Sequence, residues 1–308
     1  MTDGTLTVTP DIAVVGSVHQ DLIVRVPELP RPGETVLGHQ HFRAPGGKGA
    51  NQAVAASRLG AQVAMIGQVG DDPDGGALRE CLRSEGIEVA GVAIDPDHAT
   101  GLAVVTVDDA GENAIVVSPG ASGALSAEQV GRHADLLARS QVTLLQLEVD
   151  LAAVESAAQR SSGIVVLNPA PATELSDRLL GCVDVLVPNR DELAMLCGIE
   201  GGLDDLDEVE EAARRLADGR AVVVTLGADG ALLVHGEVAE HVPAPTVSTV
   251  DTTGAGDTLC GALAVRLAGG ATLLDALPWA VRAAALSTTR AGAQPSLPTL
   301  DEVERFTG

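Results

Sequence analysis

Short apolar runs recur along this chain, and each is followed by a turn and then by a stretch with the period of a helix. A run that is apolar at every position favours a strand buried on both faces, as in a parallel sheet covered by helices. The alternation predicts an α/β fold with a doubly wound, mainly parallel sheet flanked by helices. The runs are IAVVG (12–16), VAMIG (63–67), VTLLQL (142–147), IVVLN (164–168), VDVLV (183–187) and AVVVTLG (221–227).

Two early segments break this pattern. Residues 20–43 and 92–117 alternate apolar and polar positions around Pro and Gly turns, which is typical of antiparallel strands with one solvated face. We expect them to pair into a small antiparallel β lid over the mouth of the larger sheet. The edges and apolar face of such a lid favour a homodimer joined through the lids. Because no low-complexity linker divides the chain, residues 1–308 are predicted to form a single α/β domain with this lid.

The charge balance excludes several classes of partner. The chain has 19 Lys and Arg residues against 43 Asp and Glu residues, a formal net charge of -24, so neither nucleic acid nor membrane is an expected partner. The first residues, MTDGTLTVTPD, lack the features of a secretory signal, and the four cysteines show no CxxC spacing. These features predict a cytoplasmic protein with reduced thiols. An anionic ligand must then be held by backbone amides, helix N-termini or a metal ion.

The strongest local signal is a glycine-rich turn that opens into a helix in VDTTGAGDTLCGALAVRLAGG, residues 250–270. The amides of Gly254, Ala255 and Gly256 at such a helix start can converge on an anion. Asp257 follows in the first turn, where its carboxylate is well placed to accept a proton from a hydroxyl that attacks a bound phosphoryl group. The alternative is an ordinary turn in which Asp257 interacts only with the helix dipole.

A second glycine-rich turn opens a helix in APGGKGANQAVAASRLGA, residues 44–61. Its spacing differs from the GxxxxGK[ST] pattern of a P-loop, because Gly49 follows Lys48, so it does not predict a triphosphate cradle. Lys48 and Asn51 fit better as donors to the hydroxyl groups of a sugar.

These two motifs, with GSVHQD, NPAPA and PNRDE, stand in the order of the ribokinase family of carbohydrate kinases, which the chain resembles over nearly its whole length. The resemblance implies a ribokinase-like fold and an ATP-dependent sugar kinase, with ribose phosphorylated at its 5-hydroxyl as the leading substrate. Asp257 would be the base, and the amides of residues 254–256 the anion hole. The sugar would be bound by Asp21, Gly46, Gly47, Lys48, Asn51 and Glu148. Without the resemblance, Asp21 and Glu148 are better explained as solvated acids.

The same resemblance implies where nucleotide and magnesium bind. Asn189 and Glu192 of PNRDE follow the apolar run 183–187, at the carboxyl edge of the predicted sheet, and the family uses this NxxE unit around Mg2+ and the phosphates. Asn189 and Glu192 also match a helix N-cap, and the two roles can coexist. The loop TLGADG, with Thr225, Gly227 and Gly230, resembles the family's nucleotide-binding loop, with a hairpin turn as the alternative. Gly256 would contact the nucleotide as well.

A monovalent cation site is also implied, because family members hold K+ with oxygens near the anion hole. Most of the matching positions would contribute backbone carbonyl oxygens. They are Asp251, Thr253, Ser287, Arg290, Gly292 and Ser296.

His19 is the main departure from the family pattern, which usually has Asn at this sugar-contacting position of GSVHQD. A neutral imidazole offers one donor and one acceptor, so His19 either keeps the hydroxyl contact or reshapes the pocket for another sugar. A same-fold kinase for a nucleoside, a fructose derivative or a deoxy-keto acid sugar therefore stays open, as does a non-catalytic sugar-binding protein. A nicotinamide-dependent oxidoreductase is disfavoured, because GSVHQD stands where GxGxxG is required.

Overall fold

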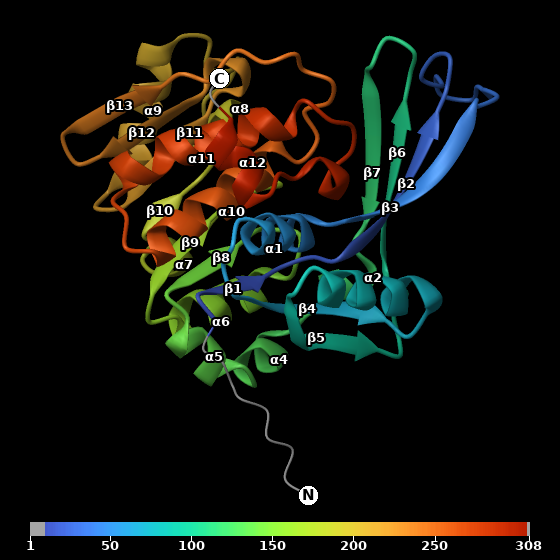
Figure 1. Cartoon of the computed structure of the whole chain (residues 1–308), viewed down its shortest axis with the longest axis horizontal. Helices are drawn as coiled ribbons and strands as arrows, with labels where there is room; N and C mark the ends of the chain where they lie inside the picture. The colour runs from blue at the N-terminus through green and yellow to red at the C-terminus, as the bar shows by residue number, and fades with distance from the viewer. Residues whose placement is uncertain (1–9, 307–308) are drawn as a thin grey trace, which may run out of the picture.

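A computed structural model describes residues 10–306 of the chain. Most of the segment in which we expect no secretory signal, residues 1–9, lies outside the described part. The described residues form a nine-stranded sheet between two layers of helices, and a four-stranded sheet that stands beside it (Figure 1). Within this range no helix is both long enough and apolar enough to cross a bilayer.

The large sheet contains every apolar run that the sequence places in strands. Its seven neighbouring strands β11, β10, β9, β8, β1, β4 and β5 run parallel, and β12 and β13 add two antiparallel strands at one edge. The run 183–187 contributes only the two-residue β10. In spatial order the strands are β13 (Val238–Val242), β12 (Ala231–His235), β11 (Ala221–Thr225), β10 (Val185–Leu186), β9 (Ile164–Leu167), β8 (Val142–Leu145), β1 (Ile12–Val15), β4 (Val63–Gly70) and β5 (Glu88–Asp95).

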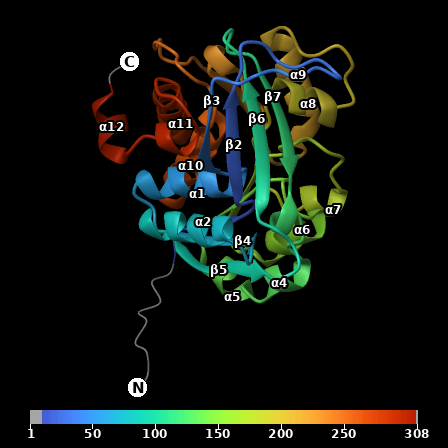
Figure 2. The same ribbon diagram turned by 90° about the vertical axis from the view of Figure 1, so that its right-hand side faces the viewer.

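The central strands are apolar throughout because both faces of the sheet are covered. In β1, Ile12 and Val14 belong to one core, and Ala13 and Val15 belong to the other. Figure 2 shows the two helical layers on opposite sides of the molecule. One layer contains α1 (Lys48–Arg58), α2 (Pro73–Ser84), α10 (Ala255–Ala268), α11 (Leu273–Ser287) and α12 (Leu300–Arg305). The other contains α4 (Ala127–Gly131), α5 (Ala134–Arg139), α6 (Leu151–Arg160), α7 (Asp177–Leu180), α8 (Arg190–Leu196) and α9 (Leu206–Ala217).

The strand order reverses between β1 and β8. From β1 the chain builds outward through β4 and β5, and it then returns to β8 and builds in the other direction. Loops that leave two such neighbouring strands diverge to opposite faces and leave a crevice at the carboxyl edge, where α/β proteins bind ligands. Gly16 and Ser17 follow β1, and Gln146 and Glu148 follow β8, so these residues border the crevice.

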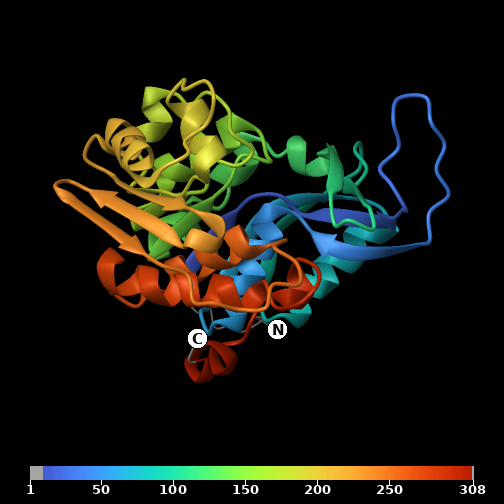
Figure 3. The ribbon, with the colours of Figure 1, turned by 90° about the horizontal axis from the view of Figure 1, so that it is seen from above.

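The small sheet is the expected lid, with strand order β3 (Gln40–Gly46), β2 (His19–Arg25), β6 (Gly101–Val107) and β7 (Asn113–Ser118). The short helix α3 (Gly120–Gly123) follows β7 at its base. The segment between β2 and β3 extends away from the body, as Figure 3 shows.

Two details of the lid prediction are wrong. The lid is mixed and not antiparallel, because β2 and β6 pair in parallel, since the chain enters both strands from the large sheet. Residues 92–95 do not belong to the lid, because they end β5 and pair with β4. As an edge strand, β5 has a partly solvated face, and this produces the same apolar–polar alternation as a lid strand.

Candidate active site

His19 and Asp21 form the lid side of the site. They project from one face of β2, because residues two apart in a strand share a face. His19 is paired with Gly46 of β3 on one side and with Gly101 of β6 on the other. A Cβ atom at Gly46 would collide with the Asp21 carboxylate, and one at Gly101 would collide with the His19 ring. The two glycines therefore leave the space that these side chains occupy.

Glu148 faces the start of α1. Its Oε2 accepts a hydrogen bond from Ser17 Oγ at 2.5 Å and another from the Lys48 amide at 2.9 Å, and it lies 3.9 Å from His19 Nδ1. The helix can begin at Lys48 because Gly47, its N-cap, has a φ of 91° that favours glycine. Glu148 is thus an anchored acid at the switch point of the sheet, which disfavours the alternative of a solvated strand-end acid.

Asp257 lies in the first turn of α10 and is 7% exposed. Its Oδ2 accepts a hydrogen bond from Asn51 Nδ2 and its Oδ1 accepts one from Gln52 Nε2, each at 3.0 Å. Both donors come from α1, so the two glycine-rich motifs of the sequence meet at this carboxylate. These two side-chain hydrogen bonds disfavour the alternative that Asp257 interacts only with the helix dipole.

Lys48 is the cation of a cluster of acids. Burial opposes its charge, but Asp257, Glu148 and Glu192 outweigh this effect and raise the pKa of Lys48, so its ammonium group stays charged. Burial raises the pKa of Asp257, and Lys48 and the amides of Asn51 and Gln52 oppose the rise. Lys48 is therefore placed to offset the repulsion among the carboxylates.

Two further groups of the cluster have shifted pKa values. Burial, followed by the charges of Glu148 and Asp257, raises the pKa of Asp21 to about 7. Burial lowers the pKa of His19 although Glu148 opposes this, so the imidazole is neutral near pH 7. Its Nε2 is buried without a hydrogen-bond partner in the described structure, and a neutral ring can offer this atom to a hydroxyl group.

A cavity of about 280 Å³ lies between Lys48, two of the acids, Asp257 and Glu192, and the glycine-rich turn. Gly254 caps α10 in the left-handed conformation, with a φ of 80°, which a glycine adopts readily. Of the three amides predicted to form the anion hole, that of Ala255 donates to the Thr252 carbonyl at 3.2 Å. Residues that line the cavity include Lys48, Asn168, Asn189, Glu192, Gly254, Gly256 and Asp257.

Asn189 and Glu192 form the N-terminal capping box of α8. Asn189 Oδ1 accepts from the Glu192 amide, and Glu192 Oε2 accepts from the Asn189 amide, both at 2.8 Å. The N-cap alternative is therefore correct, and both residues nevertheless line the cavity. Burial raises the pKa of Glu192, against the effects of the Asn189 amide and Lys48. An amide and a carboxylate at this edge are oxygen donors of the kind that Mg2+ prefers.

A larger cavity of about 490 Å³ adjoins the first, and Asn189, Thr225, Thr252 and Gly256 line both. The predicted nucleotide-binding loop, with Thr225, Gly227 and Gly230, forms one wall. The loop also joins the antiparallel strands β11 and β12, so the hairpin alternative is confirmed, and nucleotide binding by the loop stays a prediction. Leu259, Val281, Ala284 and Ala285 line the cavity too, so an aliphatic surface is available to a flat base.

The six positions predicted for a monovalent cation come from two segments that lie together. Asp251 joins them, since its carboxylate accepts from the Thr253 amide at 2.9 Å and the Gly292 amide at 2.8 Å. The side chains of the other polar positions have different partners: Ser287 donates to Ala284 O, Ser296 to Ala293 O, and Arg290 pairs with Glu302 at 2.6 Å. The Arg290 guanidinium cannot bind a cation, so this residue could contribute only its backbone oxygen.

Burial alone would raise the pKa of Asp251, but the hydrogen bonds from Thr253 and Gly292 outweigh it and lower the pKa. Asp251 is thus a carboxylate near neutral pH, and it suits a cation beside it. Residues 10–306 contain no cluster of three or more His, Cys, Asp or Glu side chains that could hold a metal ion.

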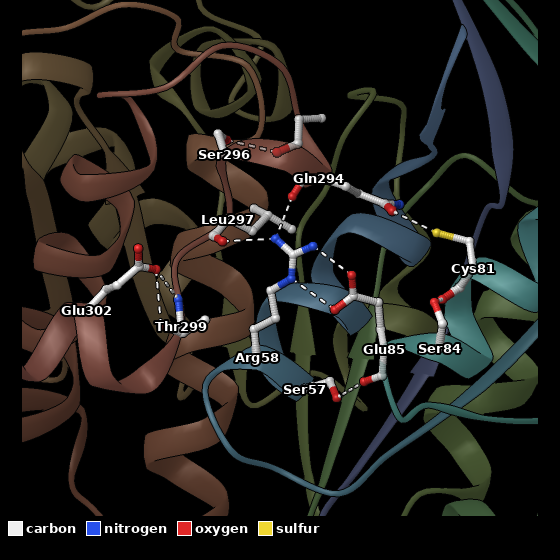
Figure 4. A network of polar contacts seen from close by, with 11 residues as sticks. Ser57, Arg58, Cys81, Ser84, Glu85, Gln294, Ser296, Leu297, Thr299 and Glu302 are labelled. Carbon is white, nitrogen blue, oxygen red and sulfur yellow. Dashed lines mark hydrogen bonds and ion pairs between the residues drawn. The ribbon is translucent and has the colours of Figure 1, made fainter.

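Arg58, in the last turn of α1, binds the C-terminal of the two segments predicted to hold the monovalent cation (Figure 4). Its guanidinium donates to the carbonyl oxygens of Gln294 at 2.7 Å and Leu297 at 3.0 Å, and it pairs with Glu85 at 2.6 Å. The helix that carries Lys48 and Asn51 at its start therefore holds residues 294–297 at its end.

Four polar residues of the site were missed in the sequence. Ser17 anchors Glu148 and the amide of Gly49, and Gln52, Gln146 and Asn168 form a buried chain of amides behind Asp257. The available signal was their position, because Ser17, Gln146 and Asn168 are polar residues at the carboxyl ends of apolar runs. Such residues face the ligand edge of a parallel sheet.

Comparisons with known proteins agree with this geometry. A family model described as "pfkB family carbohydrate kinase" matches residues 9–300. The chain is 39% identical over 299 residues to a ribokinase of Haemophilus influenzae, covering 96% of this chain and 97% of the relative. It is 38% identical over 302 residues to a deoxyribokinase of Salmonella typhi, covering 96% and 98%. Among solved structures, Arabidopsis thaliana ribokinase complexed with ribose and ATP is 30% identical, with a TM-score of 0.89 over 97% of this chain and 100% of that one.

Proposed function

The chain belongs to the pfkB family of carbohydrate kinases, and we propose that it transfers the γ-phosphoryl group of ATP to the 5-hydroxyl of D-ribose. One observation carries the proposal. The buried carboxylate of Asp257, in the first turn of α10, interacts with the charges of Asp21 and Glu148 and lines the cavity together with Gly254 and Gly256. A hydroxyl bound there has an acceptor for its proton on one side and helix amides for a phosphoryl group on the other.

In the proposed mechanism the protein's own groups act in three ways. Asp21, Glu148 and Asn51 bind and orient the sugar, since carboxylates accept from adjacent hydroxyls and the amide donates. Asp257 accepts the proton of the attacking hydroxyl. The amides at the start of α10 and the Lys48 ammonium stabilise the negative charge of the transferring group. The lid excludes water, which would otherwise compete as the acceptor.

Two metal ions complete the proposal. Asn189 and Glu192 would hold Mg2+, directly or through water, and the bound ion neutralises charge on the phosphates. K+ would lie among oxygens of the segments that Asp251 joins, next to the cap residue Gly254. Its effect would be to fix the geometry of the anion hole.

The first experiment measures ATP consumption by the purified protein with a panel of pentoses, 2-deoxyribose, hexoses and nucleosides. With Mg2+ present, the assay is run with K+ and again with tetramethylammonium as the only monovalent cation. We expect ribose to give the highest kcat/KM and K+ to raise kcat. Preference for another sugar would overturn the assignment of ribose as the substrate but would still support a sugar kinase. No turnover with any acceptor would contradict the proposal that the protein is an enzyme.

Phosphorylation of 2-deoxyribose is the second candidate activity, and His19 is the observation that favours it. Its imidazole stands where ribokinases usually have Asn, and because the ring is bulkier than an Asn side chain it can occupy the space of one sugar hydroxyl. Replacing His19→Asn is expected to shift the ratio of kcat/KM for ribose over 2-deoxyribose toward ribose by roughly tenfold, the value of one hydroxyl contact. The exposed His41→Asn is the matched control. An unchanged ratio would show that His19 does not discriminate between the two sugars.

The lid supports the proposal of a homodimer. Every residue of β7 is exposed, including Ile115 at 55% and Val116 at 70%, so this edge strand presents apolar side chains that a second copy of the lid would cover. Sedimentation of the wild-type protein is expected to give a dimer, and Val116→Glu is expected to give a monomer. A wild-type protein that sediments as a monomer at micromolar concentration would contradict the dimer.

A further inference from the structure

A continuous chain of buried side-chain amides lies next to Asp257, and one of its members, Asn168, reaches the wall of the cavity. Gln52 Nε2 donates both to Asp257 Oδ1 at 3.0 Å and to Asn168 Oδ1 at 3.2 Å. Gln52 Oε1 in turn accepts from Gln146 Nε2 at 2.6 Å, and Asn168 Nδ2 donates to the Val187 carbonyl at 2.8 Å. Gln52 and Gln146 are fully buried, and Asn168 is 9% exposed.

The direction of every hydrogen bond in this chain follows from its two ends. An ionised carboxylate and a backbone carbonyl can only accept. Asn168 must therefore turn its NH2 group toward Val187 and its oxygen toward Gln52. Gln52 must turn its NH2 group toward both Asp257 and Asn168, which leaves its oxygen for Gln146. The arrangement is thus independent of how the amide oxygen and nitrogen atoms are assigned, and it directs an amide donor at Asp257 Oδ1, which favours the ionised carboxylate.

A glycine makes room for the far end of the chain. A Cβ atom at Gly16, directly after β1, would collide with Gln146 Oε1 and approach Gly49 Cα of α1 to 3.0 Å. Gln146 follows β8, Asn168 follows β9 and Val187 follows β10. The chain of amides therefore runs along the carboxyl edge of the sheet, beside the cavity that Asn168 lines, and it connects that edge to α1 and α10.

We propose that Gln52, held in place by Gln146 and Asn168, is a positioning residue that keeps Asp257 ionised and fixes the orientation of its carboxylate. The inference rests on the proposed role of Asp257 as the base. Burial raises the pKa of Asp257, which opposes ionisation, and the Gln52 amide is one of the groups that lower it. Because Gln52 is fully buried, we expect it to affect proton transfer without contacting the sugar.

The effect of Gln52 on the ionisation of Asp257 has to be distinguished from the effects of the charged groups around this carboxylate. Lys48 of α1 favours its ionised form, whereas Glu148 disfavours it. Asp21 of β2, Glu192 of α8 and Cys260 of α10 also interact with this carboxylate. All of these groups stay in place when Gln52 is replaced by Met, which has a similar volume and lacks the amide.

The test compares the pH profiles of kcat and kcat/KM for wild type, Gln52→Met and Gln146→Met. We expect the acid limb of Gln52→Met to move up by roughly one to two pH units, the effect of losing one hydrogen bond to a carboxylate. At pH values below the wild-type acid limb its kcat then falls by roughly ten- to a hundredfold and recovers at high pH, while the Kd for ribose measured by calorimetry stays within about twofold. Gln146→Met is expected to shift the limb in the same direction by less.

Gln68→Met is the matched control, because Gln68 is also a buried glutamine, 2% exposed, whose amide donates to a carboxylate, Asp95, outside the site. It is expected to lower stability without moving the acid limb. A Gln52→Met enzyme that is slower at every pH, with an unmoved acid limb, would overturn the proposal, because a structural defect alone gives that result.

A second measurement keeps this inference separate from the proposed function. In protein labelled with 13C-aspartate, the carboxyl carbon signal of Asp257 is identified by its loss in Asp257→Asn, and its titration is followed directly. Gln52→Met is expected to raise the measured pKa by roughly one to two units. An unchanged pKa would refute the role of Gln52 even in an active kinase, and a raised pKa would support it even if no sugar were phosphorylated.

Discussion

Asp257→Asn is expected to lower kcat by roughly 10² to 10⁴, the usual contribution of a general base, while Kd values for sugar and ATP change little. Asparagine has nearly the shape of aspartate but cannot accept the proton of the attacking hydroxyl. Its NH2 group would also face one of the two amide donors, Asn51 or Gln52, which now donate to the carboxylate. Single-turnover phosphoryl transfer measured by quenched flow, with calorimetry for binding, separates the chemical step from affinity.

Asp275→Asn is the matched control for this prediction. Asp275 occupies the first turn of α11, as Asp257 does in α10, but its side chain is exposed and accepts from its own N-cap residue Thr272. If Asp257 acted only through the helix dipole, both variants would lose a few tenths of a kcal/mol to about 1 kcal/mol of stability and keep their activity. Similar activity of the two variants would therefore refute the role of Asp257 as the general base.

The large sheet was predictable because each strand has a local signature. Both faces of strands such as β1 and β8 are covered by helices, so burial makes every position apolar, and this signal needs no partner strand to be recognised. The lid was less predictable. The pairing of β2 with β6 joins residues about 80 positions apart, and a sequence pattern defines the faces of a strand but not the direction of its neighbour.

The site shows the same division. The turn before Asp257 and the turn before Lys48 were evident because glycines at a helix start have a local conformational cause. The hydrogen bonds from Asn51 and Gln52 to Asp257 connect residues about 206 positions apart in the sequence. Only the packing of α1 against α10 brings these residues together. Gln52 carries no local signature, because a glutamine within a helix is usually solvated.

Asp21→Asn is expected to stabilise the ligand-free protein at pH 8 while it weakens ribose binding. Burial and the charges of Glu148 and Asp257 raise the pKa of Asp21 from 3.8 to about 7 in the folded state. A raised acid pKa means that the folded state binds this proton more tightly than the unfolded state. The contribution of Asp21 to the free energy of unfolding is fully present below the unfolded pKa and is lost as the pH rises through about 7. Above that pH the folded protein holds an ionised carboxylate that Glu148 and Asp257 repel.

The predicted gain at pH 8 is on the order of 2 kcal/mol, which discounts the shift because the carboxylate is partly exposed. A gain of this size raises Tm by a few degrees in a chain of this length. The difference between variant and wild type should shrink as pH falls from 8 to 5, because wild-type Asp21 then takes up its proton. Thermal melts at both pH values, with the exposed Asp97→Asn as control, test this dependence. Equal Tm differences at both pH values would show that Asp21 does not titrate as proposed.

The same substitution should raise the Kd for ribose by roughly ten- to a hundredfold, because an amide accepts at one atom where a carboxylate accepts at two. The gain in stability and the loss of ribose affinity have one cause. In the ligand-free protein Asp21, Glu148 and Asp257 repel one another through a poorly solvated space, whereas in the proposed complex the sugar hydroxyls donate to them. A site selected for stability alone would not gather three acids around one lysine, so the destabilisation is itself an argument that these residues bind a ligand rich in hydroxyl groups.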